Sequence, residues 1–313
     1  MSNSPLKIFS GSSHPELAQQ IAQNLGQSLD EMIIKKFASC EIYAKPLQTV
    51  RGADVFLIQT TTDLVNEELM ELFIMIDSLK RSFASNVHVV IPHFGYSRQD
   101  RVASPREPIT AKLVAKLISA AGADHVITVQ LHSEQAQGFF DFPVDNLSVN
   151  KLFANYFKEK NVQDLVVVAP DTGAAKSAQR FADLLGVELA IIHKVRAAHN
   201  VSEAMHVIGD VQGRTCVVID DLIDTAGTVV NCKQALIRAG AAEDVYLMAT
   251  HPIFSPPAVE RLKEAQFKEV IVSDTIPLPP EKRFPGLQII SVAPLLAQII
   301  RNVHEGKSVS DVY

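Results

Sequence analysis

The sequence predicts an α/β fold in which mostly parallel strands are covered by helices on both faces. Short apolar runs alternate with segments of helical spacing along the chain, and runs such as Val166–Val168 contain no polar position. A strand that is apolar on both faces is typical of a parallel sheet buried between helices. A length of 313 residues with 47% hydrophobic residues fits two globular domains of this kind.

The first half of the chain alternates strands and helices. The predicted elements are a strand at Val55–Ile58, a helix at Asn66–Phe83, a strand at Val87–Ile91, a helix at Thr110–Ala121 and a strand at Val126–Val129. The first helix is predicted from apolar residues at helical spacing, and Gly122 marks the end of the second because glycine readily ends a helix.

The second half repeats the alternation. It predicts a helix at Lys151–Lys160, a strand at Leu165–Val168, a helix at Ala174–Leu185 that ends at Gly186, and strands at Val217–Ile219 and Leu287–Ile290. The proline-rich stretch Ile276–Pro280 predicts a loop before the last strand.

Composition excludes several functional classes. With 29 Lys and Arg against 35 Asp and Glu, the net charge is −6, which argues against nonspecific nucleic-acid binding. No apolar run approaches the ~18 residues of a membrane span, and the first residues lack the pattern of a secretory signal. The three cysteines are widely spaced, which fits a reducing cytosol better than a disulfide framework or zinc site. We therefore expect a cytoplasmic protein without membrane or nucleic-acid partners.

Two pairs of strand ends resemble each other. Val90–Gly95 resembles Val168–Gly173, and each half later ends a strand in a polar cluster, at Val129–Glu134 and Ile219–Asp224. The pattern predicts an internal duplication, although any two α/β halves share some strand–loop chemistry. Ligands bind beyond the carboxyl ends of parallel strands, so the chemistry is expected at these four clusters.

A boundary near Ser148 separates the halves, which predicts an N-terminal domain at 1–148 and a C-terminal domain at 149–313. The alternative that the last residues pack back on the first domain stays open.

The most informative segment is Val217–Thr228. A buried strand leads into Asp220 and Asp221, then into the small-residue turn Asp224–Thr228 and a helix. Such a turn can direct several N–H groups at a phosphate, while two adjacent carboxylates suit vicinal hydroxyls or a metal ion. A phosphate beside a diol describes a ribose 5-phosphate; the alternative is a capped helix with a solvated acidic turn.

This segment resembles the ribose-phosphate signature of type I phosphoribosyltransferase folds. Further motifs narrow the resemblance to the ribose-phosphate diphosphokinase family, also called phosphoribosyl pyrophosphate synthetases: Phe94–Arg101, Leu131–Phe140 and Ala249–Ser255, within a likeness that runs from Ile8 to Ser310. The resemblance implies two tandem type I phosphoribosyltransferase-like domains related by pseudo-twofold symmetry. It also implies transfer of the diphosphoryl group of ATP to the 1-hydroxyl of ribose 5-phosphate, which gives 5-phospho-α-D-ribose 1-diphosphate and AMP.

The resemblance also implies roles for individual residues. The implied catalytic residue is Lys194, and the implied magnesium ligands are His132 and Asp171. The implied ATP contacts are Ser39, Cys40, Glu41, Arg98 and Gln99. The implied ribose 5-phosphate contacts are Arg196, Asp220, Asp224, Thr225, Ala226, Gly227 and Thr228. The family further implies a homodimer that builds toward a hexamer.

The chain departs from the family pattern at three places. Gln130 stands where the family usually has aspartate, which lowers the negative charge near one magnesium position. Cys40 occupies a position often filled by glycine. The loop at 101–106 carries fewer cations than the family's regulatory loop, which predicts weak stimulation by phosphate.

Two other functions stay open. A phosphoribosyltransferase would share the Asp220–Thr228 segment but needs only one such domain. A non-catalytic regulatory subunit should have lost Lys194 or Arg196, and both are present.

Overall fold

A computed structural model describes residues 4–195 and 204–312 of the chain. The chain forms two compact units. The first contains the residues up to Ser148, Thr275–Pro277 and the segment from Ser291 onward; the second contains Val149–Asp274 and Leu278–Ile290. The last helix therefore belongs to the first unit, although it follows the whole of the second in the sequence.

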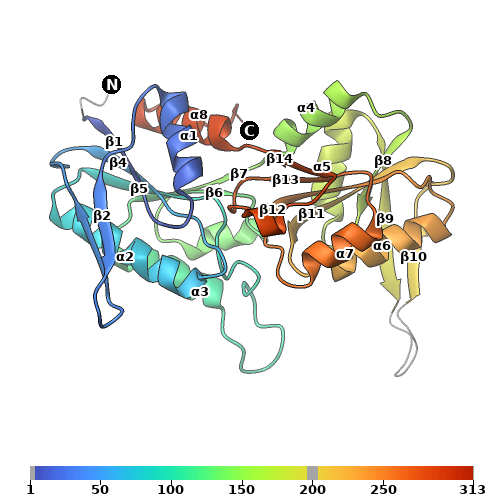
Figure 1. The fold of residues 1–313 in the computed structure, drawn as a ribbon, viewed down its shortest axis with the longest axis horizontal. Helices are drawn as coiled ribbons and strands as arrows, with labels where there is room; N and C mark the ends of the chain where they lie inside the picture. The colour runs from blue at the N-terminus through green and yellow to red at the C-terminus, as the bar shows by residue number, and fades with distance from the viewer. Residues whose placement is uncertain (1–3, 196–203, 313) are drawn as a thin grey trace. The chain divides into compact units, whose positions relative to one another are not determined.

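The first unit is built on a five-stranded parallel sheet with the order β1-β4-β5-β6-β7 (Figure 1). A separate antiparallel ribbon is formed by β2 and β3. The strands are β1 (Leu6–Ser10), β2 (Met32–Lys36), β3 (Ile42–Pro46), β4 (Asp54–Ile58), β5 (Asn86–Ile91), β6 (His125–Val129) and β7 (Val144–Leu147).

Two pairs of helices cover the two faces of this sheet (Figure 1): α1 (Pro15–Leu25) contacts α8 (Ala293–His304), and α2 (Val65–Arg81) contacts α3 (Thr110–Ala121). All five residues of β4 are buried. Val55 and Leu57 pack in one core with α2 and α3, whereas Phe56 points to the other face and stacks on His88. Burial on both faces explains why this strand contains no exposed polar position.

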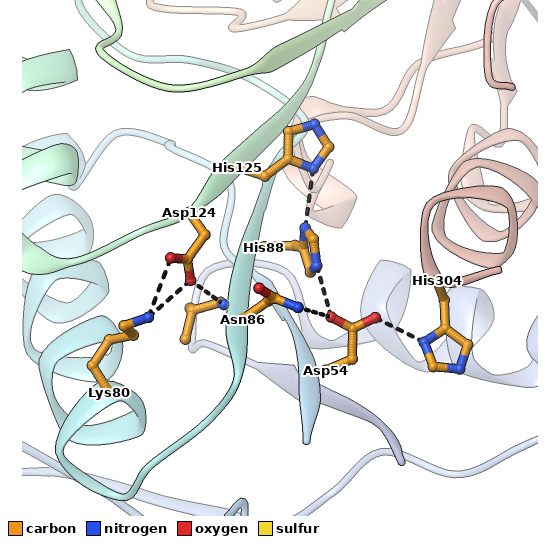
Figure 2. Close-up of polar contacts among 8 residues, drawn as sticks. Asp54, Lys80, Asn86, His88, Asp124, His125 and His304 are labelled. Atoms are coloured by element: carbon orange, nitrogen blue, oxygen red, sulfur yellow. Dashed lines mark hydrogen bonds and ion pairs between the residues drawn. The ribbon is translucent and has the colours of Figure 1, made fainter. Parts of the chain in front are cut away.

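A buried polar network around Asp54 ties α8 to this sheet (Figure 2). One carboxylate oxygen of Asp54 accepts hydrogen bonds from His88 Nε2 at 2.8 Å and Asn86 Nδ2 at 3.1 Å, and the other accepts from His304 Nδ1 at 2.7 Å. His88 also contacts His125, with their Nδ1 atoms 3.1 Å apart. Burial by itself raises the pKa of Asp54, but the hydrogen bonds from His88, His304 and Asn86 and the charge of His88 lower it to about 2.

The second unit contains a seven-stranded sheet with the order β10-β9-β8-β11-β12-β13-β14. Its strands are parallel except at one edge, where β10 runs antiparallel to β9. The strands are β8 (Leu165–Ala169), β9 (Glu188–Val195), β10 (Ala204–Ile208), β11 (Thr215–Ile223), β12 (Val245–Pro252), β13 (Val270–Ser273) and β14 (Leu287–Ile290). The helices are α4 (Asn150–Lys160), α5 (Ala175–Leu185), α6 (Gly227–Arg238) and α7 (Ala258–Ala265).

Both units therefore have the predicted α/β architecture of mostly parallel sheets flanked by helices (Figure 1). In the second unit α4 packs on α5 and α6 packs on α7. The alternate residues Val166 and Val168 lie in one core with α6 and α7. The similar strand ends identified in the sequence follow neighbouring strands in both sheets, β5 beside β6 and β8 beside β11.

None of the helices within the described ranges has both the length and the apolar character needed to cross a bilayer.

Candidate active site

Asp220 and Asp221 lie inside β11 and not after it. The sequence predicts a strand at Val217–Ile219, but β11 continues to Ile223 because its far end pairs with β12, through contacts such as Leu222 opposite His251. On its other side, β11 stops pairing with β8 at Val218. The two aspartates therefore stand where β11 extends past a shorter neighbour, which leaves one side of the strand without a backbone partner from β8.

Three carboxylates gather around this extension. The Asp220 Oδ1 atom accepts a hydrogen bond from the backbone N–H of Asp221 at 2.9 Å. Burial raises the pKa of Asp220 well above its ordinary value, and the nearby charges of Asp221 and Asp171 raise it further. Such a cluster favours a bound cation or a group that donates hydrogen bonds, such as a hydroxyl.

Asp171 enters this cluster from the loop after β8. Its Oδ1 atom accepts a hydrogen bond from the N–H of Ala174 at 3.0 Å, which fixes the turn before α5. A β-carbon at Gly173 would lie 3.2 Å from the same oxygen, so glycine at this position leaves Asp171 uncrowded. Asp171 and the two aspartates of β11 are thus brought together at the carboxyl ends of two neighbouring central strands, β8 and β11.

The segment Asp224–Thr228 forms the predicted turn and leads directly into α6, which begins at Gly227. Ala226, the residue before α6, has φ 62° and ψ 2°, a left-handed conformation unusual for alanine. Its methyl group is buried, with only 5% of the residue exposed. The first N–H groups of a helix have no acceptor within the helix, so those of α6 can bind an anion.

Sequence reasoning missed one residue at this turn. The Arg261 Nη1 atom on α7 donates a hydrogen bond to the carbonyl oxygen of Thr225 at 3.0 Å. No motif in the sequence connects Arg261 with a turn 36 residues earlier; only the packing of α7 beside α6 reveals the contact.

His132, the other implied magnesium ligand, lies in the first unit. It is exposed in the loop after β6. Two backbone N–H groups fix the path of that loop: Gln130 N donates to Leu147 O at 2.9 Å, and Leu131 N donates to the side-chain oxygen Asn146 Oδ1 at 2.9 Å. Across residues 4–195 and 204–312, no three His, Cys, Asp or Glu side chains form a preassembled metal site.

Arg98 and Gln99 are both exposed in the loop between β5 and α3. The Gln99 side chain accepts a hydrogen bond from Thr110 Oγ1 at 2.5 Å, and its backbone carbonyl accepts from Ala111 N at 3.1 Å. These contacts fix the backbone beside Arg98 to the start of α3.

Ser39, Cys40 and Glu41 form the exposed turn between β2 and β3. Ser39 Oγ donates to Glu41 Oε2 at 2.6 Å, and Cys40 has φ 67°. A left-handed conformation at Cys40 explains why glycine would suit this position. The ring of Phe37 is 47% exposed beside the same turn and contacts Tyr43 edge-on.

Lys194 lies in β9, where its backbone pairs with Met205 of β10. Its side chain is outside the described part of the structure, and Arg196 lies outside the described residues altogether.

Two family models match the chain. The model for the N-terminal domain of ribose phosphate pyrophosphokinase matches residues 6–122, and the model for the phosphoribosyl synthetase-associated domain matches residues 196–313.

Curated relatives match nearly the whole chain. The ribose-phosphate pyrophosphokinase of Caldanaerobacter subterraneus subsp. tengcongensis is 51% identical over 309 residues, which cover 98% of both chains. The enzyme of that name from Synechococcus elongatus is 50% identical, covering 99% of this chain and 94% of its own. The crystal structure of phosphoribosylpyrophosphate synthetase from Mycobacterium smegmatis superimposes with a TM-score of 0.91 at 44% identity, covering 97% of this chain and all of that one. This chain therefore belongs to the ribose-phosphate pyrophosphokinase family.

Proposed function

We propose that the two units divide the substrates of one reaction. The first unit, which contains domain 1–148 of the sequence, holds ATP, and the second, which contains most of domain 149–313, holds ribose 5-phosphate. The reaction transfers the diphosphoryl group of ATP to the 1-hydroxyl of ribose 5-phosphate, and the products are 5-phospho-α-D-ribose 1-diphosphate and AMP. The proposal rests on one observation. The Asp220–Asp221 pair lies near the carboxyl end of β11, and the turn Asp224–Thr228, named here the phosphate-type turn, follows it and begins α6.

Ribose 5-phosphate is held at this site through both of its ends. The turn Asp224–Thr228 supplies backbone N–H groups and the hydroxyls of Thr225 and Thr228 to the phosphate. Asp220 and Asp221 accept hydrogen bonds from the vicinal hydroxyls of the sugar. A sugar hydroxyl can donate a hydrogen bond to a carboxylate, whereas an ionised phosphate cannot. The acidic pair therefore also selects the orientation in which the sugar binds.

ATP is held by the exposed residues of the first unit. Arg98 supplies a planar guanidinium that forks onto phosphate oxygens, and Gln99 supplies an amide for the base or the ribose. Glu41, with Ser39 and Cys40, contacts adenine from the β2–β3 turn. The exposure of these side chains fits a site that is completed only when substrate binds.

The residues fit a magnesium ion. Magnesium takes oxygen ligands, retains water and needs few protein groups. Asp171 supplies carboxylate oxygens beside Asp220 and Asp221, where mutual repulsion favours a cation. His132 is the second ligand that the family resemblance implies. Once bound, the ion would neutralise charge on the phosphate oxygens of ATP.

Lys194 and Arg196 act on the diphosphoryl group itself. Lys194 provides a point charge and Arg196 a planar fork for the oxygens on which negative charge collects during transfer. The enzyme works in the cytoplasm as a homo-oligomer, a dimer that builds to a hexamer. The cysteines support the location: Cys40 is exposed, Cys216 and Cys232 are buried, and no disulfide joins any of them within the described residues.

The decisive experiment measures AMP release from ATP with and without ribose 5-phosphate, across a series of magnesium concentrations. We expect release only with both substrates and magnesium present. A phosphoribosyltransferase would instead consume the diphosphate product, and a regulatory subunit would show no turnover. Either result would contradict the proposal.

A further inference from the structure

The guanidinium of Arg261 lies against the backbone of the phosphate-type turn. Besides the 3.0 Å hydrogen bond from its Nη1 atom to Thr225 O, the same atom would lie 3.5 Å from a β-carbon built on Gly227, an ordinary contact distance. Arg261 therefore covers the turn from Thr225 to Gly227 on one side. Arg261 is exposed, and its guanidinium makes this hydrogen bond to the turn.

The helix that carries Arg261 is firmly held. Ala258, Val259 and Leu262 of α7 are buried in the same core as Leu236 of α6. Lys233 of α6 donates to the carbonyl oxygens of Ala265, the last residue of α7, at 2.9 Å and of Gln266, the residue after it, at 2.5 Å. Because α6 and α7 are locked together in this way, Arg261 meets the start of α6 from a fixed position.

The peptide that Arg261 holds is attached to a strained residue. The φ angle of Ala226 is the rotation between this peptide and the Ala226 α-carbon, and its value of 62° is one that alanine disfavours. A flip of the peptide between Thr225 and Ala226 would relieve this strain. The flip would also move the Thr225 carbonyl away from Arg261 and turn the Ala226 N–H in another direction.

The carbonyl and N–H of a trans peptide point in opposite directions. By fixing Thr225 O on the α7 side, Arg261 fixes the Ala226 N–H on the opposite side. That N–H belongs to the residue immediately before α6, which begins at Gly227.

We propose that Arg261 is a positioning residue for ribose 5-phosphate. It holds the Thr225–Ala226 peptide in the strained orientation that aims the Ala226 N–H at the phosphate. This inference rests on the proposed function, since it assumes that the phosphate binds in this turn.

The test is steady-state kinetics of Arg261→Ala, with Lys263→Ala as the matched control because Lys263 is an exposed cation on the same helix. We expect Arg261→Ala to raise the KM for ribose 5-phosphate about tenfold, with the KM for ATP, kcat and the melting temperature nearly unchanged. The control should match wild type. An unchanged KM for ribose 5-phosphate, or equal increases in both KM values, would overturn the proposal.

Two further measurements distinguish two roles for Arg261. In the first role, named here the brace, Arg261 holds the Thr225–Ala226 peptide; in the second, its charge only attracts the phosphate. If Arg261 acted only by attracting the phosphate, the effect of Arg261→Ala would fade as salt is added; a brace predicts a similar fold-change at low and high salt. A brace also predicts that Arg261→Ala costs less in an Ala226→Gly background, because glycine accepts a positive φ without strain. Equal costs in both backgrounds would contradict it.

Asp220→Asn distinguishes failure of the brace from failure of the site. If Asp220→Asn raises the KM for ribose 5-phosphate and Arg261→Ala does not, the brace alone is wrong. If neither variant changes that KM, the proposed ribose 5-phosphate site is wrong as well.

Discussion

Several residues of the candidate site have unusual backbone conformations. Four of the residues that have positive φ without being glycine stand in or beside a segment proposed to contact substrate or metal. They are Cys40, Tyr96, Gln130 and Ala226. Such conformations cost energy and persist only where surrounding contacts hold them. At Gln130 those contacts include the backbone hydrogen bond to Leu147 O, and at Ala226 they include the packing around its buried methyl group.

Lys194 gives the sharpest prediction for a single residue. If its charge acts on the diphosphoryl group mainly as negative charge develops, Lys194→Ala should lower kcat by about 10² to 10³ and leave both KM values nearly intact. Lys194→Arg should restore activity only in part, because a planar fork cannot replace a point charge in the same geometry. Kinetics of both variants beside a thermal melt provide the check. Wild-type kcat in Lys194→Ala would exclude the residue from the mechanism, and a large fall in melting temperature would indicate a structural role.

At the scale of elements, the shape of the site depends on two neighbouring strands, β8 and β11, that differ in how far they extend. β11 extends past the last residue that pairs with β8, Val218, and its later residues pair with β12. Asp220 and Asp221 therefore stand in a part of β11 that has β12 as a neighbour on one side and no pairing with β8 on the other. In the first unit, the network around Asp54 connects the ends of separate elements, namely the start of β4 and the last residue of α8 (Figure 2).

This network predicts an acid-sensitive contribution to stability. The pKa of Asp54 falls from 3.8 to about 2 on folding, so its stabilising effect is complete above about pH 4 and is lost as the pH falls through 2. The contribution amounts to about 2 kcal/mol. Asp54→Asn should unfold more easily in urea at pH 7 and should lose less stability than wild type between pH 4 and pH 2.

The groups that face Asp54 define the controls. They are Asn86, His88 and His304, with His125 behind His88 and Asp145 3.2 Å from His125; the Lys80–Asp124 ion pair lies nearby (Figure 2). His304→Ala should reproduce part of the loss. Asp77→Asn should not change the profile, because Asp77 pairs with Arg81 on the exposed face of α2. A wild-type profile in Asp54→Asn would show that the network adds no stability.

At the scale of the whole molecule, the first unit is completed by the end of the chain. α8 buries Leu296, Ile299 and Ile300 beside α1, and Ser291 Oγ donates to Gln20 Oε1 at 3.1 Å. Thr60 Oγ1 also donates to the carbonyl oxygen of Thr275 at 2.7 Å. The first unit thus includes Thr275–Pro277, which interrupts the second unit in the sequence, and the segment from Ser291 onward, which follows it.

A chain shortened to end at Ile290 should therefore lose the first unit and keep the second. Burial of three large aliphatic side chains contributes about 5–8 kcal/mol, which is comparable to the total stability of a domain. Limited proteolysis followed by mass spectrometry should show cleavage throughout residues 4–148 and protection of Val149–Asp274. Protection of both regions in the shortened chain would show that α8 is dispensable for the first fold.

The buried central strands and their helices were predictable because burial on both faces leaves an unbroken apolar run. β4, β5, β6 and β8 were predicted with bounds close to those observed. The ribbon of β2 and β3 and the edge strand β10 were not predicted, since exposed residues interrupt their apolar pattern. The site segments were recognisable as motifs, but the contact of Arg261 was not, because it joins residues with no shared pattern.

The sequence by itself determined the fold class, the family and the segments proposed to carry the chemistry, because apolar periodicity and short motifs are local properties of the chain. The tertiary structure alone decided how far β11 extends past β8, which peptide Arg261 holds, and that α8 completes the first unit. These features arise from strand pairing and helix packing between residues distant in sequence, so no local pattern contains them.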